Sequence, residues 1–213
     1  MMAGRHVKET AEKPSRRGSA LAVVVILLSV VLLVFAAIRV GGWFSRRQDA
    51  GTVVLVNRWN PVENSGFTPK LQEVQGVRVD ESLVKPLEEL LAAARSAGFA
   101  PALRDGYLTA EEENGSGCMV PGESEHELGL AVHFSEQNGR DADFSQWLAG
   151  NAWRCGFILR YPEGAEESTG LVSYSHYRYV GPAVAEQIRT LGISLEEYMD
   201  LFYGDSAEVI FEK

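Results

Sequence analysis

The chain has 213 residues and a formal net charge of −9 at neutral pH. This charge is unevenly distributed, because residues 1–47 carry +6 and the remaining residues carry −15. Such an acidic domain excludes nucleic acid and bare anionic lipid as favourable partners, since both are themselves negatively charged. The chain beyond the basic N-terminal segment has room for one folded domain of roughly 165 residues with a substantial core.

A long apolar stretch lies near the N-terminus. Residues 19–38 read SALAVVVILLSVVLLVFAAI and contain no charged side chain. A bilayer core requires about 20 apolar residues in a helix, so we predict a transmembrane anchor over residues 19–40, between a cytoplasmic tail (1–18) and a stalk (41–51). A cleaved secretory signal is the alternative, because residues 34–36 resemble a cleavage site, but the apolar stretch is longer than the core of most signals.

The charges that flank this stretch predict its orientation. Five basic residues precede it and three follow it. Positive charge favours the cytoplasmic side, so we expect a single-pass protein of the cell membrane with residues 52–213 forming an extracytoplasmic domain. An exported domain permits a disulfide, but the sequence leaves open whether Cys118 and Cys155 pair.

The first elements of the domain can be predicted in chain order. Residues 52–57 are rich in β-branched side chains and predict a strand, whereas residues 60–70 contain two prolines and a glycine and predict an irregular segment. A helix follows, with Asp80 as its N-cap and Gly98 as its stop. Its apolar stripe has helical spacing and consists of Leu83, Leu87, Leu90, Leu91 and Ala94. Residues 99–103 predict a short strand.

The second half of the domain alternates short strands with helices of unequal length. Residues 111–122 are polar and glycine-rich and predict a loop. Strands are expected over residues 130–134, 157–161 and 177–180, and helices over residues 144–155, 182–192 and from Ser194, where Glu197 completes a capping box. This pattern indicates an α+β fold, with a small mixed and mainly antiparallel sheet, flanking helices and one preceding transmembrane helix.

Three histidines lie within the predicted domain. His126, His133 and His176 occur in turn-rich or strand-end segments. Three imidazoles are a common ligand set for zinc, with a fourth position open for water. Their spacing alone does not establish a site, because Gly129 interrupts any helix shared by the first two, and scattered histidines are more often surface or packed residues.

Four short sequence motifs, two of which contain these histidines, resemble the pattern of a known family. Residues 124–133 read SEHELGLAVH and residues 175–181 read SHYRYVG, with GFILRYPEG over 156–164 and LVNRWNP over 55–61. Together they resemble the VanY-type D-alanyl-D-alanine carboxypeptidases, whose pattern is close to SxHxxGxAxD followed by ExWH and RYVG. The resemblance covers residues 55–203. It implies the fold of the LD-carboxypeptidase and Hedgehog group and a zinc enzyme that trims stem peptides of bacterial peptidoglycan ending in D-Ala-D-Ala.

The resemblance also implies the metal ligands. His126 corresponds to the first zinc ligand of the family and His176 to the last. His133 stands where the family has an aspartate ligand. Because imidazole is itself a good zinc ligand, the resemblance implies a three-histidine zinc site.

Other residues match positions around that site. The resemblance implies substrate binding by Ser124, Tyr107 and Arg178. For Arg178, as for Arg160, structural pairing with some of the many acidic side chains is the alternative.

The position of the catalytic base departs from the family pattern. The family has a glutamate three residues before the last histidine, which acts as general base and then as general acid. Here that position is Ser173, so the catalytic base is unknown. Glu166 and Glu167 lie nearby in the sequence and are the candidate substitutes.

The position of the substrate clamp departs as well. The family has SGYRS, whose arginine is expected to bind the terminal carboxylate of the substrate, and the matching residues 105–109 read DGYLT. Leu108 therefore occupies the arginine position, although a bidentate clamp needs a guanidinium group. Arg104 lies four positions away, and Glu113 stands where a glutamine is common.

These departures leave two functions open. The loss of a general base typically lowers a rate by about 10²–10⁴-fold, and the loss of a clamp also impairs substrate positioning. The departures favour a catalytically impaired relative that binds stem peptides at the cell wall. The alternative is an active zinc carboxypeptidase with a rearranged three-histidine site and a displaced base.

Overall fold

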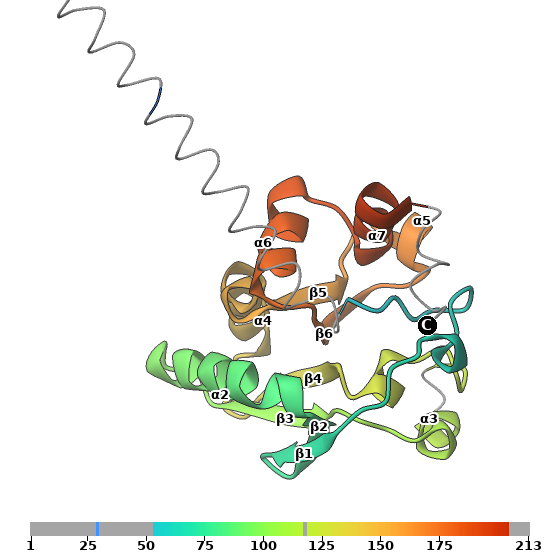
Figure 1. The fold of residues 1–213 in the computed structure, drawn as a ribbon. Coiled ribbons are helices and arrows are strands. Elements are labelled where there is room, and N and C mark those ends of the chain that lie inside the picture. The colour runs from blue at the N-terminus through green and yellow to red at the C-terminus, as the bar shows by residue number, and fades with distance from the viewer. Residues whose placement is uncertain (1–28, 30–52, 117–118, 205–213) are drawn as a thin grey trace, which may run out of the picture. The chain divides into compact units, whose positions relative to one another are not determined.

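The computed structural model describes residues 29, 53–116 and 119–204 of the chain (Figure 1). The predicted tail and stalk lie outside these residues, as do Cys118 and, apart from Ser29, the predicted anchor. Among the described residues, no helix is long and apolar enough to cross a membrane. From Val53 onward the described chain belongs to one unit with two antiparallel sheets and flanking helices, which confirms the α+β class.

The first two strands form a small hairpin. Strands β1 (Leu71–Val74) and β2 (Val77–Asp80) pair antiparallel around a two-residue turn. Both turn residues, Gln75 and Gly76, have positive φ angles of 53° and 78°, as expected in a tight hairpin turn whose twist matches that of the strands. The sequence patterns considered above did not predict this hairpin.

Helix α2 (Glu81–Ser96) follows directly and confirms the prediction for this segment. The Asp80 side chain accepts a hydrogen bond from the backbone N–H of Ser82, so it caps the helix as expected. Pro86 is the sixth residue of the helix, in its second turn, where the missing N–H removes one intrahelical hydrogen bond. All members of the predicted apolar stripe are buried, namely Leu83, Leu87, Leu90, Leu91 and Ala94.

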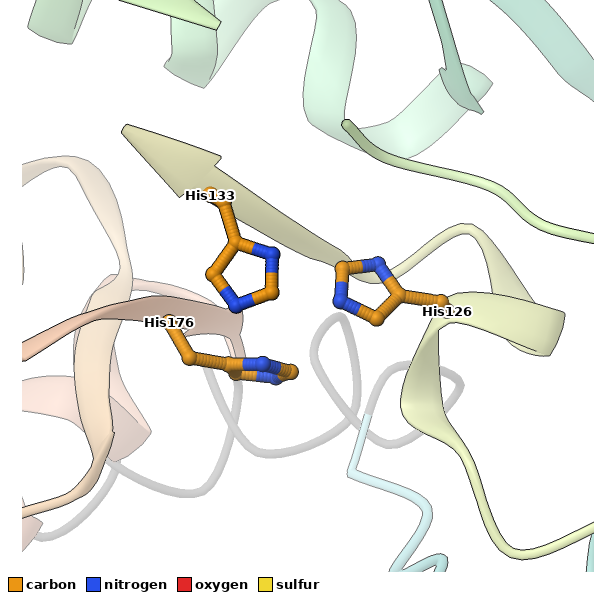
Figure 2. Close-up of side chains that lie close together, drawn as sticks. All are labelled: His126, His133 and His176. Atoms are coloured by element: carbon orange, nitrogen blue, oxygen red, sulfur yellow. The ribbon is translucent and has the colours of Figure 1, made fainter. Parts of the chain in front are cut away.

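The main sheet has four strands in the order β3-β4-β6-β5, and each neighbouring pair is antiparallel. These strands are β3 (Pro101–Asp105), β4 (Ala131–Glu136), β6 (Ser173–Tyr179) and β5 (Phe157–Tyr161). In this register His133 of β4 lies opposite Asp105 on one side and opposite His176 on the other. The sheet therefore brings two of the candidate ligands together on adjacent strands (Figure 2).

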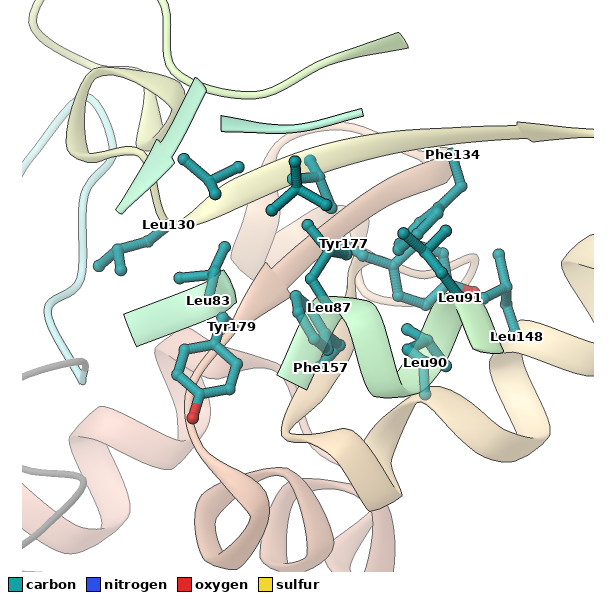
Figure 3. Packing of buried hydrophobic residues seen from close by; sticks show 14 of the residues in the cluster. Leu83, Leu87, Leu90, Leu91, Leu130, Phe134, Leu148, Phe157, Tyr177 and Tyr179 are labelled. Atoms are coloured by element: carbon teal, nitrogen blue, oxygen red, sulfur yellow. The ribbon is translucent and has the colours of Figure 1, made fainter. Parts of the chain in front are cut away.

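Side chains alternate along the strands, so the two faces of the sheet differ in character. His176 and Arg178 of β6 alternate with Tyr177 and Tyr179, which belong to the main apolar cluster. Figure 3 shows this cluster between the sheet and helix α2, with Leu148 of helix α4 (Asp141–Asn151) packing beside it. The apolar face thus forms the core and leaves the opposite face for polar groups.

The C-terminal helices were also predicted. Helix α6 (Pro182–Leu191) ends at Gly192, and helix α7 (Leu195–Tyr203) begins with the capping box between Ser194 and Glu197. They contribute to a second apolar cluster, whose members include Val184, Ile188, Leu195 and Tyr198.

Two predictions of local structure were wrong. Described residues 53–57 form no strand, because their one ladder contact is an isolated bridge between Asn57 and Asn60. Residues 111–122 are not entirely a loop, since helix α3 (Ala110–Ser116) occupies their first half. Acidic residues are favourable in the first turn of a helix, and the run of glutamates there is a signal that the glycines nearby obscured.

Candidate metal centre

Three histidines from different elements meet at one point. His126 comes from the 3-10 helix η2 (Glu125–Leu128), His133 from β4 and His176 from β6. One ligand atom from each lies within 4.8 Å of the others, and the ring centroids are 4.8–4.9 Å apart. Figure 2 shows the three rings turned toward a common centre. The three candidate ligands therefore lie together in the folded chain.

The hydrogen bonds of the rings show which nitrogens are free to bind a metal. The Nδ1 of His126 lies 2.6 Å from the carbonyl oxygen of Gly106 and donates to it, so its Nε2 carries the lone pair. That Nε2 is buried and has no hydrogen-bond partner among the described residues. The Nδ1 of His133 is hydrogen-bonded to the Asp105 carboxylate. This contact favours the tautomer of His133 in which Nε2 carries the lone pair. A buried lone pair without a donor fits a metal ligand.

The surroundings of two of the rings, His126 and His176, favour their neutral form. Burial, together with the nearby His176 and His133, lowers the pKa of His126 to about 3. Burial also lowers the pKa of His176, although the adjacent Glu125 opposes this effect. Metal binding requires neutral imidazole, so at neutral pH His126 and His176 are in the protonation state that a metal needs.

The local chain path around His126 depends on two residues of the SEHELG word. The Ser124 side chain accepts a hydrogen bond from the His126 backbone N–H at 3.2 Å. Gly129 ends the 3-10 helix with a φ of +65°, and a Cβ there would lie 2.9 Å from the backbone nitrogen of Asp80. Only glycine fits this position easily, because both its backbone angle and the neighbouring chain disfavour a side chain.

His176 is supported by a buried ionic cluster. Its Nε2 lies 3.6 Å from Oε2 of Glu125. Arg160 and Arg178 approach the other carboxylate oxygen of Glu125 at 2.8 and 3.2 Å, and Arg160 also pairs with Glu196 at 2.6 Å. Burial raises the pKa of Glu125, but the two arginines outweigh it and hold the pKa well below its usual range.

Glu125 and Glu196 were not singled out from the sequence. Glu125 lies within the SEH motif, directly before the first ligand. This position was the one signal in the sequence that could have identified Glu125 as a residue of the site. Nothing in the local sequence indicates that Glu196, in the first turn of α7, contacts Arg160. That contact depends on how α7 packs against the sheet.

The expected substrate-binding residues differ in their accessibility. Arg178 is 0% exposed, and it donates hydrogen bonds to the backbone carbonyls of Val54 and Tyr179. These contacts fit the alternative of structural pairing, because direct contact with a substrate would require an accessible surface. Ser124 is buried beside the cluster, whereas Tyr107 is half-buried with the Arg78 guanidinium over its ring.

The position of the family's base carries no carboxylate. Ser173 is half-buried at the start of β6, opposite Tyr161. Glu166 and Glu167 lie in helix α5 (Glu166–Thr169), and within the described part of the chain neither forms an ion pair or hydrogen bond with a histidine. Glu167 instead lines a cavity of about 650 Å³, whose lining includes apolar-face residues such as Phe157.

The clamp positions do lie beside the histidines. The Leu108 backbone N–H donates to the carbonyl oxygen of His126 at 3.3 Å. Glu113 is 1% exposed and hydrogen-bonded to Ser124, and its pKa is raised because it is buried. Arg104 is exposed on β3 and forms no hydrogen bond or ion pair with any residue that the structure describes. A leucine and a glutamate thus stand where the family pattern has an arginine and commonly a glutamine.

Comparison with known proteins identifies relatives along most of the domain. The VanY family model, described as D-alanyl-D-alanine carboxypeptidase, matches residues 109–182. A D-alanyl-D-alanine carboxypeptidase of Enterococcus faecalis is 34% identical over 70% of this chain and 66% of its own length. The bifunctional D-Ala-D-Ala dipeptidase and carboxypeptidase VanXYC of Enterococcus gallinarum is 30% identical over 70% of this chain and 94% of its own length. The chain thus spans slightly less than two thirds of the E. faecalis protein.

Solved structures agree with these relatives. VanYB in complex with D-alanine-D-alanine has a TM-score of 0.65 and 33% identity, over 71% of this chain and 98% of VanYB. A VanY D,D-pentapeptidase in complex with Zn(II) has a TM-score of 0.63 and 34% identity, over 70% of this chain and 99% of that chain. Both the sequence and the fold therefore show that this chain belongs to the VanY family of D-alanyl-D-alanine carboxypeptidases.

Proposed function

We propose that this chain is a membrane-anchored, zinc-binding protein that binds D-Ala-D-Ala stem peptides of peptidoglycan outside the bacterial cell, with impaired hydrolysis. One observation carries the proposal: the three histidines converge, while the base position holds Ser173 and the clamp position holds Leu108. The metal-binding part of the family site is therefore present without the groups that would transfer protons and bind a carboxylate.

The residues present define what the site can do. His126, His133 and His176 would hold the ion, and a zinc ion would supply Lewis-acid polarisation of a peptide carbonyl. Of the expected substrate-binding residues, the half-buried Tyr107 lies where a bound peptide could be contacted, whereas Ser124 is buried. Since no carboxylate occupies position 173, the family's proton-accepting group is absent from its usual position, and the loss of such a group typically lowers the rate by about 10²–10⁴-fold.

The location is part of the same proposal. The uncharged stretch over residues 19–38, with more basic residues before it than after it, supports an anchor with the domain outside the cytoplasm. Peptidoglycan lies on that side of the membrane, so the anchor would place the domain beside its ligand. A reporter fused after Lys213 that is active only when exported tests this orientation, and a reporter active only in the cytoplasm would contradict it.

An active carboxypeptidase with a displaced base is the second candidate. Glu113 favours it, because this carboxylate is buried beside Ser124, interacts electrostatically with His133 and has a raised pKa. A raised pKa makes a carboxylate a stronger proton acceptor, which suits a general base. Glu166 and Glu167 are weaker candidates for the base, because within the described residues neither forms an ion pair or hydrogen bond with a histidine.

The deciding experiment combines three measurements on the full-length chain. These are the bound zinc per chain, D-alanine release from a stem pentapeptide, and retention of the same peptide. Zinc and peptide binding with little release supports the impaired protein. Release at ordinary enzyme rates, about 1–10³ s⁻¹, would refute it. Glu113→Gln should then abolish release, with Glu166→Gln and Glu167→Gln as matched controls.

A further inference from the structure

Asp105 and His133 face each other on adjacent strands of the main sheet. In the antiparallel pairing of β3 and β4, Asp105 lies directly opposite His133. Its carboxylate oxygen Oδ1 contacts Nδ1 of the His133 ring, and the same oxygen lies 3.8 Å from Nε2 of His126. One carboxylate therefore borders two of the three rings of the histidine cluster.

An irregularity in β3 sets this arrangement. The register between β3 and β4 shifts between Leu103 and Asp105, so Arg104 is an additional residue in the ladder. A bulge of this kind bends the strand and redirects the side chains that follow it. Here it places Asp105 against His133, with the Asp105 side chain 32% exposed. The contact depends on this pairing and is not inherent in the local sequence.

The two positions also differ together from the family pattern. The pattern SGYRS has a serine where this chain has Asp105, and SxHxxGxAxD has an aspartate where this chain has His133. The pattern thus places a hydroxyl on one strand and a carboxylate on the next. This chain places a carboxylate on the first strand and an imidazole on the second, so the pair still contributes one negative charge.

We propose that Asp105 is a positioning residue of the metal centre, which supplies through His133 the negative charge that an aspartate ligand would supply directly. A carboxylate on Nδ1 selects the tautomer with a lone pair on Nε2, holds the ring orientation and makes the imidazole a stronger ligand. It also offsets one of the two positive charges that three neutral imidazoles would leave uncompensated. The inference rests on the proposed binding of zinc.

Zinc affinity of the full-length chain tests this role without relying on catalysis. Dissociation constants can be measured by competition with a chromophoric chelator. Asp105→Ala removes both the charge and the hydrogen bond and should weaken zinc binding by about 10–100-fold. Asp105→Asn keeps an oxygen that can accept from Nδ1 and should have a smaller effect. Glu112→Gln is the matched control, because it removes the same charge from an acid that pairs with Arg78.

Two double variants show whether Asp105 acts through His133. In a His133→Ala background the further change Asp105→Ala should have little effect, since the ring that it positions is gone. Conversely, Asp105→Ser with His133→Asp reproduces the family pattern and should bind zinc at least about tenfold more tightly than Asp105→Ser alone. Urea unfolding of each metal-free variant monitors the fold independently.

The outcomes separate this inference from the proposed function. If the wild-type chain binds zinc and Asp105→Ala binds it equally well, the positioning role is wrong and the zinc site remains. An undiminished Asp105→Ala effect in the His133→Ala background would mean that Asp105 contacts the metal itself, which also overturns the role. A wild-type chain that takes up no zinc would instead refute the metal part of the proposed function, and this inference with it.

Discussion

His176 and Ser173 lie three residues apart on strand β6, yet the structure constrains them very differently. His176 lies between β4 and β5, opposite His133, and contacts the buried carboxylate of Glu125. Ser173 lies beyond the last pair of β4 and β6 and next to a register irregularity with β5. A change at His176 would disturb a buried network, whereas a change at Ser173 disturbs little.

This difference explains how the base and clamp residues of a family site can change while its metal ligands are kept. His133 and His176 lie on the two inner strands of the main sheet and His126 is buried beside them, so their replacement would affect folding as well as metal binding. The base and clamp positions, Ser173 and Leu108, are half-buried and support little else. Catalytic groups at such positions can be exchanged at small cost in stability, which is consistent with a retained metal cluster beside altered catalytic positions.

The largest expected effect comes from restoring the base. Ser173→Glu should raise D-alanine release from a stem pentapeptide by about 10²–10⁴-fold on zinc-loaded protein, because it places a carboxylate at the family spacing from His176. Adding Leu108→Arg should lower KM by supplying a guanidinium for the terminal carboxylate. Tyr174→Glu, one position along and 57% exposed, is the control. Equal gains from both glutamates would contradict the positional argument.

A large effect on stability is expected in the buried ionic cluster beside His176. Glu125→Gln removes the negative charge shared by Arg160 and Arg178, which leaves buried positive charge uncompensated. The free energy of unfolding should fall by about 3–5 kcal/mol, as measured by urea denaturation. Glu111→Gln, on an exposed helix position, should change it by less than about 0.5 kcal/mol. A comparable loss of stability in both variants would contradict a specific stabilising role of the buried cluster.

A smaller effect should follow from metal addition. Zinc at 100 times its dissociation constant should raise the free energy of unfolding by about 2.7 kcal/mol, since a ligand that binds only the folded state stabilises it by mass action. His126→Ala should abolish the shift because it removes a ligand. A shift that persists in this variant would mean that zinc binds elsewhere on the chain.

The smallest effect at mildly acidic pH concerns metal-free protein, and this effect grows with further acidification. The folded chain keeps His126 neutral down to about pH 3, whereas an unfolded histidine takes up a proton near pH 6.5. The unfolded state therefore binds more protons between these values, so stability is complete above about pH 6.5 and falls on acidification by up to ~1.4 kcal/mol per pH unit. Chelator-treated protein unfolded in urea at several pH values tests this, and His126→Gln should flatten the dependence.

Several features were predictable because their signals lie within short windows of sequence. The cap and apolar stripe of α2, and the capping box of α7, depend on residues at most one or a few turns apart. The words around His126 and His176 likewise identified the ligands through their resemblance to a family pattern. The helix α3 was missed because glycines in the same window also indicate a loop.

The fold class, the main helices and the three metal-ligand candidates could all be predicted from the order of the amino acids. The pairing of Arg178 and Arg160 with Glu125, and the contact between Asp105 and His133 across 28 residues, became visible only in the folded chain. Helix caps and periodicity could be predicted because they act between neighbours along the chain. Contacts between strands depend instead on register, on a bulge in β3 and on the path of the whole sheet, none of which is encoded in a single window.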